Sequence, residues 1–251
     1  MICYFSATGN CQYAAGRIAA ALGDKSVSIA EAGTDISLSE GEVFGIITPT
    51  YFWELPLPTR EFLSAVRLPD SKKHYIFLVA TYGTTPGCCG EHARKLLKKH
   101  GCVLDASFSL KMPDSWTPFF DLSDPVKVAH QNQKADHEMA GIISRIKMQE
   151  KGNHTKLRIP YVFRFLTDPL LNIACRTKNF YAEDTCIGCG LCAKKCPAQA
   201  IEIRNGKPVW VKKRCDLCLG CLHRCPEFAI QYGDGRTKLH GQYHHPNAER
   251  G

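Results

Sequence analysis

The sequence lacks a long apolar segment that is free of charged residues. Its most apolar later stretch, residues 157–175, is interrupted by Arg158, Pro160, Arg164, Asp168 and Pro169, which excludes a membrane span. The first residues show no basic region and no apolar segment followed by a small-residue cleavage site, so no secretory signal is predicted. We therefore expect a cytoplasmic chain whose cysteines are reduced or bound to metal.

Two common nucleotide-binding motifs are also missing. No Walker lysine follows the loop after the first predicted strand, which argues against nucleotide hydrolysis. The GxGxxG-type spacing occurs at Gly188–Ala193, but that stretch lies among cysteines and follows no strand of a βαβ unit. A nicotinamide cofactor is accordingly not predicted.

The first part of the chain has no excess of positive charge. The net charge is +8, yet the first 149 residues are balanced and the excess lies beyond them. Eight cysteines in that later region are expected to be metal-bound thiolates, which offset the excess charge. Nucleic-acid binding is therefore not favoured. A basic face that docks an acidic redox protein is the preferred interpretation, with a merely solvated face as the alternative.

The first 149 residues alternate apolar runs with amphipathic segments, which is typical of strands and helices in a parallel α/β sheet. Helices are expected before Gly23, before Gly101 and after Asp124–Pro125. The second crossover, Glu31–Glu42, is barely long enough for a helix, so a short helix and a loop are both open. The pattern predicts a doubly wound, five-stranded parallel sheet whose strands are Ile2–Phe5, Val27–Ala30, Val43–Ile47, His74–Ala80 and Val103–Leu110.

The remaining chain divides into three further segments. Residues 150–180 form a connector with a helical piece near Leu166–Cys175, which we expect to dock against the protein's own domains and not on a membrane. Residues 181–232 form a small second domain, in which Asn205–Gly206 predicts a hairpin. Residues 233–251 are polar and rich in glycine and histidine, and are predicted to be a tail.

The second domain contains an internal repeat in which residues 186–201 align with residues 215–230, cysteine for cysteine. Each copy has the spacing C-x2-C-x2-C-x3-C-P. Three thiolates on a tight loop wrap one 4Fe-4S cluster, and the fourth cysteine serves the other cluster. The predicted ligand sets are Cys186, Cys189, Cys192 and Cys225 for one cluster, and Cys215, Cys218, Cys221 and Cys196 for the other.

Zinc is the structural alternative for these cysteines. Zinc usually takes two separated CxxC pairs per ion, whereas here the whole four-cysteine spacing occurs twice, so iron–sulfur binding is preferred. Over about residues 180–232 the sequence resembles the bacterial dicluster ferredoxins. This resemblance implies a small α+β domain.

A phosphate-binding loop is predicted between the first strand and the first helix. Hydroxyl and amide side chains alternate there with small residues at a helix N-terminus, where backbone N–H groups and the helix dipole favour a phosphate. The pattern resembles the FMN-phosphate loop of flavodoxins, with Cys11 in place of the final threonine. The candidate phosphate ligands are Ser6, Thr8, Gly9, Asn10 and Cys11.

Two later loops are expected to meet the flavin ring, because FMN in flavodoxin-like folds lies at the carboxyl ends of the strands. The first offers aromatic side chains for stacking, and the second offers glycines that let backbone amides approach the ring. For Phe52, ring contact and a packing role are equally favoured. The candidate residues are Pro49, Thr50, Tyr51 and Trp53 in the first loop, and Thr81, Tyr82, Gly83 and Gly87 in the second.

Nearly the whole chain resembles flavodoxin–ferredoxin fusion proteins, in which a flavodoxin-like domain precedes a two-cluster ferredoxin domain. The resemblance implies one FMN, two 4Fe-4S clusters and an electron-transfer function with a redox protein partner. The alternative is an FMN-dependent oxidoreductase that reduces a small molecule and uses the clusters as an internal wire. Proton donors for that reaction would come from Tyr51, Glu54 or Tyr82.

For several residues the sequence leaves two interpretations open. Cys88 and Cys89 are a redox-active pair or, preferably, structural thiols. His244 and His245 bind a metal or belong to a flexible tail. The segment that contains Asp114, Ser115, Trp116 and Phe119 forms a lid beside the flavin or a plain packed loop.

Overall fold

The fold is known from a computed structural model, which describes residues 1–68, 71–163, 165, 169, 171 and 173–248. A parallel six-stranded sheet forms the first part of the molecule, in the order β2-β1-β3-β4-β5-β6. Its first five strands have the 2-1-3-4-5 order of flavodoxin-like sheets, which confirms the predicted fold class. The strands are β1 (Ile2–Tyr4), β2 (Ser26–Ser28), β3 (Val43–Pro49), β4 (Tyr75–Tyr82), β5 (Ala106–Lys111) and β6 (Gly152–Asn153).

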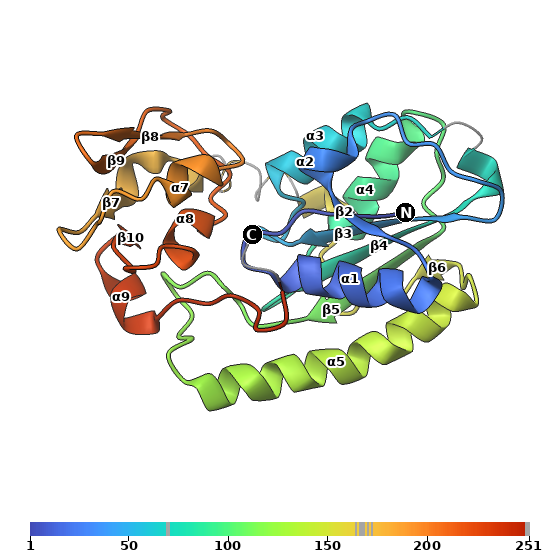
Figure 1. Ribbon diagram of the computed structural model, residues 1–251. Coiled ribbons are helices and arrows are strands. Elements are labelled where there is room, and N and C mark those ends of the chain that lie inside the picture. Colours follow the sequence, from blue (N-terminus) through green and yellow to red (C-terminus); the bar gives the residue numbers. More distant parts are fainter. Residues whose placement is uncertain (69–70, 164, 166–168, 170, 172, 249–251) are drawn as a thin grey trace.

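Helices cover both faces of this sheet (Figure 1). One face packs against α1 and α5 around Phe77 and Phe108, and the other packs against α3 and α4 around Phe44 and Leu63. The helices of this part are α1 (Asn10–Leu22), α2 (Ile29–Ala32), α3 (Leu57–Ala65), α4 (Cys89–Lys98) and α5 (Pro125–Lys147), with a 3-10 turn, η1 (Ser71–Lys73).

The predicted helix boundaries are confirmed where a local signal sets them. Gly23 ends α1 with a left-handed φ of 67°. Asp124 begins α5, since its carboxylate accepts the backbone N–H groups of Val126 and Lys127. Gly101, also left-handed, follows the end of α4.

Some details differ from the sequence-based expectation, and one decides between its two alternatives. The strand predicted at Val27–Ala30 ends at Ser28, because the Ser28 hydroxyl accepts the N–H of Ala30 and starts α2. No further helix follows α2 in residues 33–42, so most of that crossover is a loop. The sheet gains a sixth strand, β6, from the predicted connector; a two-residue strand has no hydrophobic pattern to reveal it.

The smaller second part is built from two pseudo-equivalent halves with a core around Phe180, Leu222 and Ile230. The strands β8 and β9 are joined through Asn205 and Gly206, both with positive φ, as the hairpin signal predicts. Its elements are η3 (Thr177–Asn179), β7 (Phe180–Ala182), α7 (Leu191–Lys194), β8 (Ile201–Arg204), β9 (Lys207–Trp210), α8 (Gly220–His223), β10 (Ile230–Tyr232) and α9 (Arg236–His240).

The connector packs on the first part through η2 (Tyr161–Phe163) and the residues before it. Ile159 donates its N–H to the carbonyl of Gly87, and the Lys95 ammonium lies 3.5 Å from the ring centroid of Tyr161. Much of the helix predicted at Leu166–Cys175 lies outside the described residues. Of its described residues, Leu171 and Cys175 are buried in the core of the second part.

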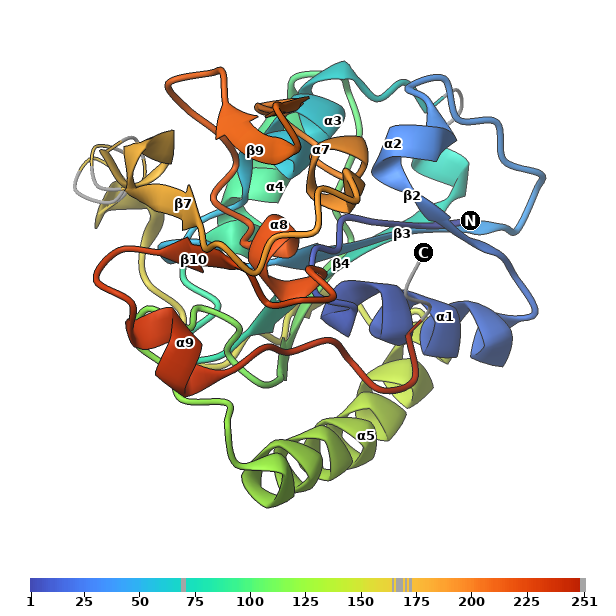
Figure 2. The same cartoon turned by 60° about the vertical axis from the view of Figure 1, so that its left-hand side comes forward.

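The segment after Gly233, predicted to be a polar tail, is folded. It forms α9 and then runs back to the start of α1 (Figures 1 and 2). Tyr243 and His245 of this stretch are buried. Two buried aromatic side chains in a polar stretch do not form a periodic pattern, so this packing cannot be recognised from hydrophobic periodicity. Among the described residues no helix is both long and apolar enough to cross a membrane.

Candidate functional site

A cavity with a volume of about 300 Å³ lies at the carboxyl ends of the central strands. It is called the main cavity because most of the predicted cofactor residues line it. The loops after β1, β3, β4 and β5 form most of its wall, so four separate loops meet at one edge of the sheet. This is the position that binds ligands in open α/β sheets. A fifth segment, Leu217–Leu219, comes from the second part of the molecule and closes the cavity on that side.

The loop after β1 presents small polar side chains to this cavity at the start of α1. Thr8 lies 3.3 Å from the Ser115 hydroxyl, and Ser6 accepts the backbone N–H of Gly9. Cys11 replaces a hydroxyl residue of the flavodoxin pattern, and its Sγ lies 3.1 Å from the Thr81 hydroxyl. Burial raises the pKa of Cys11 to about 12, so this side chain is a neutral thiol at physiological pH.

The loop after β3 makes a tight turn in which Tyr51 and Glu54 exchange backbone hydrogen bonds. Phe52 and Trp53, at its tip, both have positive φ, at 49° and 64°, which is costly for bulky residues. Phe52 packs edge-on against Trp116, so it contributes both to the cavity wall and to the contact between the two parts.

The loop after β4 needs its glycines for close packing. A Cβ atom on Gly87 would lie 1.8 Å from the carbonyl oxygen of Trp53, and one on Gly83 would lie 2.0 Å from the Asp114 carboxylate. Gly83 thus allows Asp114 to enter the cavity wall, where burial raises the pKa of its carboxyl. Asp114 is therefore the acidic side chain that faces the cavity.

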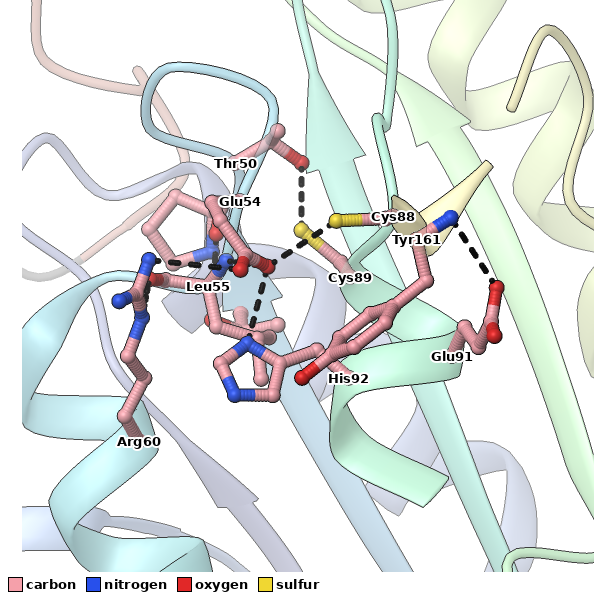
Figure 3. A network of polar contacts seen from close by, with 11 residues as sticks. Thr50, Glu54, Leu55, Arg60, Cys88, Cys89, Glu91, His92 and Tyr161 are labelled. Atoms are coloured by element: carbon pink, nitrogen blue, oxygen red, sulfur yellow. Dashed lines mark hydrogen bonds and ion pairs between the residues drawn. The ribbon is translucent and has the colours of Figure 1, made fainter. Parts of the chain in front are cut away.

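Glu54, one of the predicted proton donors, is part of a buried network beside the cavity (Figure 3). Its carboxylate lies 2.9 Å from His92 Nδ1 and 3.6 Å from Arg60, and it accepts the Cys88 thiol at 3.3 Å. Burial raises the pKa of Glu54, but the hydrogen bond and charge of His92, together with Arg60, outweigh burial and lower it. Glu54 does not line the cavity, so its role is to anchor the turn at Phe52 and Trp53.

Cys88 and Cys89 are both buried at the start of α4 and are not bonded to each other. Cys89 faces the Thr50 hydroxyl at 3.5 Å, and burial raises the pKa of its thiol far above the usual value. A buried neutral thiol is a poor nucleophile, which favours the structural interpretation of this residue.

The eight repeated cysteines surround two small cavities in the second part. The structure brings each predicted set of four together, with one member of each set contributed by the opposite half of the repeat. One cavity is lined by Cys186, Cys189, Cys192 and Cys225, and the other by Cys215, Cys218, Cys221 and Cys196. The described residues contain no group of side chains spaced for a single metal ion.

The backbone repeats as the sequence does. Ala200 donates its N–H to Cys196 Sγ, and Ala229, 29 residues later, donates in the same way to Cys225 Sγ, both at 3.3 Å. Hydrogen bonds of this kind tune the potential of a bound cluster. The two cysteine loops also share a left-handed backbone, but the first uses Gly188 and Gly190 where the second uses Leu217 and Leu219.

The two leucines explain why the second loop accepts an unfavourable backbone. A left-handed non-glycine residue costs roughly 1–2 kcal/mol, yet Leu217 and Leu219 are almost fully buried. Their side chains belong to the core of the second part and also wall the main cavity. Glycine at these positions would relieve the backbone and leave the wall open.

Direct hydrogen bonds fix the two parts of the molecule to each other beside this wall. Arg224 donates to the carbonyl of Ser6 at 3.3 Å, and His223 Nε2 lies 2.8 Å from the carbonyl of Ser115. His223 is buried, which lowers its pKa to about 4 and keeps the ring neutral. The second part is therefore docked on the cavity and does not hang from a free tether.

Most of the predicted cofactor residues line the cavity. The exceptions are Gly9, which faces the C-terminal segment, and Gly87, which packs on Trp53. The segment after β5 is part of the wall, through Asp114, Ser115, Trp116 and Phe119. The sequence analysis did not predict that Leu217–Leu219 would form part of the cavity wall. Nothing in a cysteine motif indicates which surface of the other domain it will contact.

Comparison with known proteins supports the second part most directly. Residues 185–230 match the family described as 4Fe-4S dicluster domain. A ferredoxin from Pyrobaculum islandicum is 41% identical over 56 residues, which are 22% of this chain and 52% of the ferredoxin. The chain thus spans about half the length of that curated relative. The second part is a ferredoxin-type 4Fe-4S domain, which implies electron transfer.

Among solved structures, the chain is similar to the metal-soaked Flv1 flavodiiron core from Synechocystis sp. PCC6803. The two share 15% identity with a TM-score of 0.33, over 58% of this chain and 36% of that one. A likeness this weak does not bear on function. The flavodoxin-like class of the first part rests on its own strand order.

The Glu54 network predicts a pH-independent loss of stability on substitution. Glu54→Gln should lower the free energy of unfolding by about 1.5–3 kcal/mol, the worth of hydrogen bonds to a charged group. The folded-state pKa of Glu54 is lowered, so its stabilising effect is complete above the unfolded-state value of about 4.3. Denaturant unfolding should therefore give the same difference from pH 8 down to about pH 5.

Glu91→Gln is the matched control, because Glu91 is exposed and pairs with Lys95 on the helix surface. Its contact with the Tyr161 backbone N–H is one that a glutamine side chain can also accept. Its effect should stay below about 0.5 kcal/mol. A difference for Glu54→Gln that shrinks between pH 8 and pH 5 would mean that Glu54 titrates there and is available as a proton donor.

Proposed function

We propose that this chain is an iron–sulfur flavoprotein that passes electrons between two 4Fe-4S clusters in its second part and FMN in the main cavity. The observation that carries this proposal is the position of Leu217–Leu219. Cys218, a predicted cluster ligand, lines the same cavity as the phosphate loop and the aromatic loop. The protein thereby brings a cluster loop and a flavin-type cavity into direct contact.

FMN fits the residues of the cavity. Ser6 and Thr8 lie at the start of α1, where hydroxyl groups and backbone N–H groups favour a phosphate. Tyr51 and Trp53 offer aromatic faces to a flavin ring from the loop after β3. Thr81–Thr85 form the opposite edge, with the backbone accessible at Gly83.

Two clusters fit the two cysteine-lined cavities. Burial raises the pKa of Cys192 to about 11 and of Cys215 to about 12, so these thiols lose their protons only when metal is bound. The basic excess of the second part offsets the negative charge of the thiolate ligands. A 4Fe-4S cluster exchanges single electrons, and a flavin exchanges one or two, so this pairing converts between both kinds of transfer.

The two cluster sites are not equivalent in access. Cys189 and Ile187, in the first loop, are exposed, whereas Leu217 and Leu219, in the second loop, are buried and line the main cavity. The outer site, where a redox protein partner would exchange electrons, is therefore the one lined by Cys186, Cys189, Cys192 and Cys225. The site of Cys215, Cys218, Cys221 and Cys196 is the inner one, next to the flavin cavity.

One observation favours the alternative, an FMN-dependent oxidoreductase acting on a small molecule. Asp114 lines the cavity, and burial raises the pKa of its carboxyl, as expected for a proton donor. Tyr51 and Tyr82 also face the cavity, and burial raises their pKa values, so both are neutral phenols. Loss of small-molecule turnover in Asp114→Asn with FMN still bound would favour this function.

Paired cysteine variants test the crossed ligand sets. Wild-type protein prepared without oxygen should contain about eight iron atoms and eight sulfides, and Cys192→Ala about four of each. Adding Cys225→Ala should remove no further iron, since both residues serve the same cluster. Adding Cys196→Ala should remove nearly all of it. If instead Cys192→Ala with Cys225→Ala lost nearly all the iron and Cys192→Ala with Cys196→Ala lost no more than Cys192→Ala alone, each cluster would be held by a single motif. Zinc with little iron in the wild-type protein would reject the clusters altogether.

The phosphate loop predicts a difference between FMN and riboflavin. Thr8→Ala should weaken FMN binding by about 1.5–3 kcal/mol, because it removes a hydrogen bond to a charged phosphate. Riboflavin lacks the phosphate, so its affinity should hardly change. Thr84→Ala, on the ring side of the cavity, should affect both ligands equally. Equal losses for Thr8→Ala, measured by flavin fluorescence titration, would contradict the proposal.

Rapid-mixing kinetics test the function itself. The docked arrangement predicts that flavin reduction after cluster reduction is intramolecular, with a rate that stays constant over a tenfold range of protein concentration. Cys196→Ala removes a ligand of the inner cluster and should abolish this fast phase while FMN remains bound. A rate proportional to protein concentration would mean that electrons arrive from another molecule.

A further inference from the structure

The C-terminal segment Gln242–Ala248 lies on the outer side of the phosphate loop. The Tyr243 hydroxyl donates to Asn10 Oδ1 at 2.6 Å and also lies 3.2 Å from Asn132 Oδ1 of α5. The backbone N–H of His245 donates to the carbonyl of Thr8 at 2.9 Å. Tyr243 and His245 are 4% and 2% exposed, so both contacts are shielded from water. The segment thus holds two successive parts of the loop.

Packing adds to these hydrogen bonds. The imidazole of His245 stacks on the Tyr13 ring of α1, with centroids 3.9 Å apart and planes 19° apart. Gly9 lies directly under the segment: a Cβ atom there would lie 2.8 Å from Ala248 Cβ and 3.0 Å from His245 Cβ. The glycine of the phosphate loop is therefore required by this contact as well as by its φ of 88°.

The same segment is tied to the second part of the molecule. Gln242 Nε2 donates to the carbonyls of Leu222 and Cys225, both at 2.7 Å. The N–H of Tyr243 donates to His223 Nδ1 at 3.1 Å, and the other nitrogen of His223 contacts Ser115. Neighbouring residues of this short segment therefore form hydrogen bonds both to the cysteine-bearing domain and to the phosphate loop.

From these contacts we infer that Gln242–Ala248 is a structural strap of the cofactor site. Tyr243 and His245 are positioning residues that keep the phosphate loop in its binding conformation, and Gln242 links that loop to the docked ferredoxin-type domain. The strap leaves the cavity free, because no residue of Gln242–Ala248 lines it while Ser6, Thr8 and Asn10 do. The identity of the ligand as a phosphate-bearing flavin rests on the proposed function.

Tyr243→Phe tests the strap, since it removes one hydroxyl and keeps the ring. We expect the Kd for FMN to rise roughly threefold to tenfold, the range for one neutral hydrogen bond, with riboflavin affinity nearly unchanged. In cofactor-free protein, amide hydrogen exchange in residues 6–13 should become faster. Iron content should stay at the wild-type value, which shows that the ferredoxin-type domain is intact.

Tyr75→Phe is the matched control. Tyr75 is also buried and donates one hydrogen bond, to the carbonyl of Glu150 at 2.7 Å, but it lies at the start of β4, away from the cavity. It should leave both flavin affinities and the exchange of residues 6–13 unchanged. A chain that ends at Gly241 should show a larger effect than Tyr243→Phe, because it loses the contacts of His245 as well.

The outcomes separate the strap from the proposed function. Unchanged FMN affinity and unchanged exchange in both Tyr243→Phe and the shortened chain would overturn the strap and leave FMN binding standing. Failure of the wild-type protein to bind FMN would overturn the proposed function, whereas faster exchange of residues 6–13 in the variants would still support the strap.

Discussion

The architecture depends on one contact, the packing of the second cysteine loop against the carboxyl edge of the parallel sheet. Leu217 and Leu219 are buried between the core of the second part and the main cavity. Around them, Arg224 and His223 bond to the backbone of the loops after β1 and β5. Because this interface is also a cavity wall, the site is complete only when both parts are in place.

The repeat shows how two nearly identical loops acquire different environments. Both keep the same left-handed backbone, which glycine adopts without strain and leucine adopts at a cost. The first loop has glycines and stays exposed at Cys189, whereas the second has leucines that are buried. Since solvent exposure shifts the potential of an iron–sulfur cluster, two sites with the same ligands need not have the same potential.

Several sequence-based predictions were wrong or incomplete, and in each case the cause is a contact between distant residues. Glu54 follows the aromatic loop directly and was a candidate proton donor, but His92 and Arg60 hold it away from the cavity. The C-terminal segment was predicted to be a tail because of its polar composition, yet Tyr243 and His245 are buried and His245 stacks on Tyr13 of α1. Asp114 faces the cavity because Gly83, in the loop after β4, leaves room for it.

The sequence alone determined what local chemistry dictates: the alternation of strands and helices, the caps at Gly23 and Asp124, the Asn205–Gly206 hairpin and the spacing of the repeated cysteines. These depend on residues close together in the chain, whose backbone preferences and ligand geometry are nearly independent of context. The tertiary structure decided which loop of the second part meets the cavity and where the final residues lie. Those outcomes depend on the fit of surfaces far apart in sequence, such as Leu219 against the cavity and Tyr243 against Asn10.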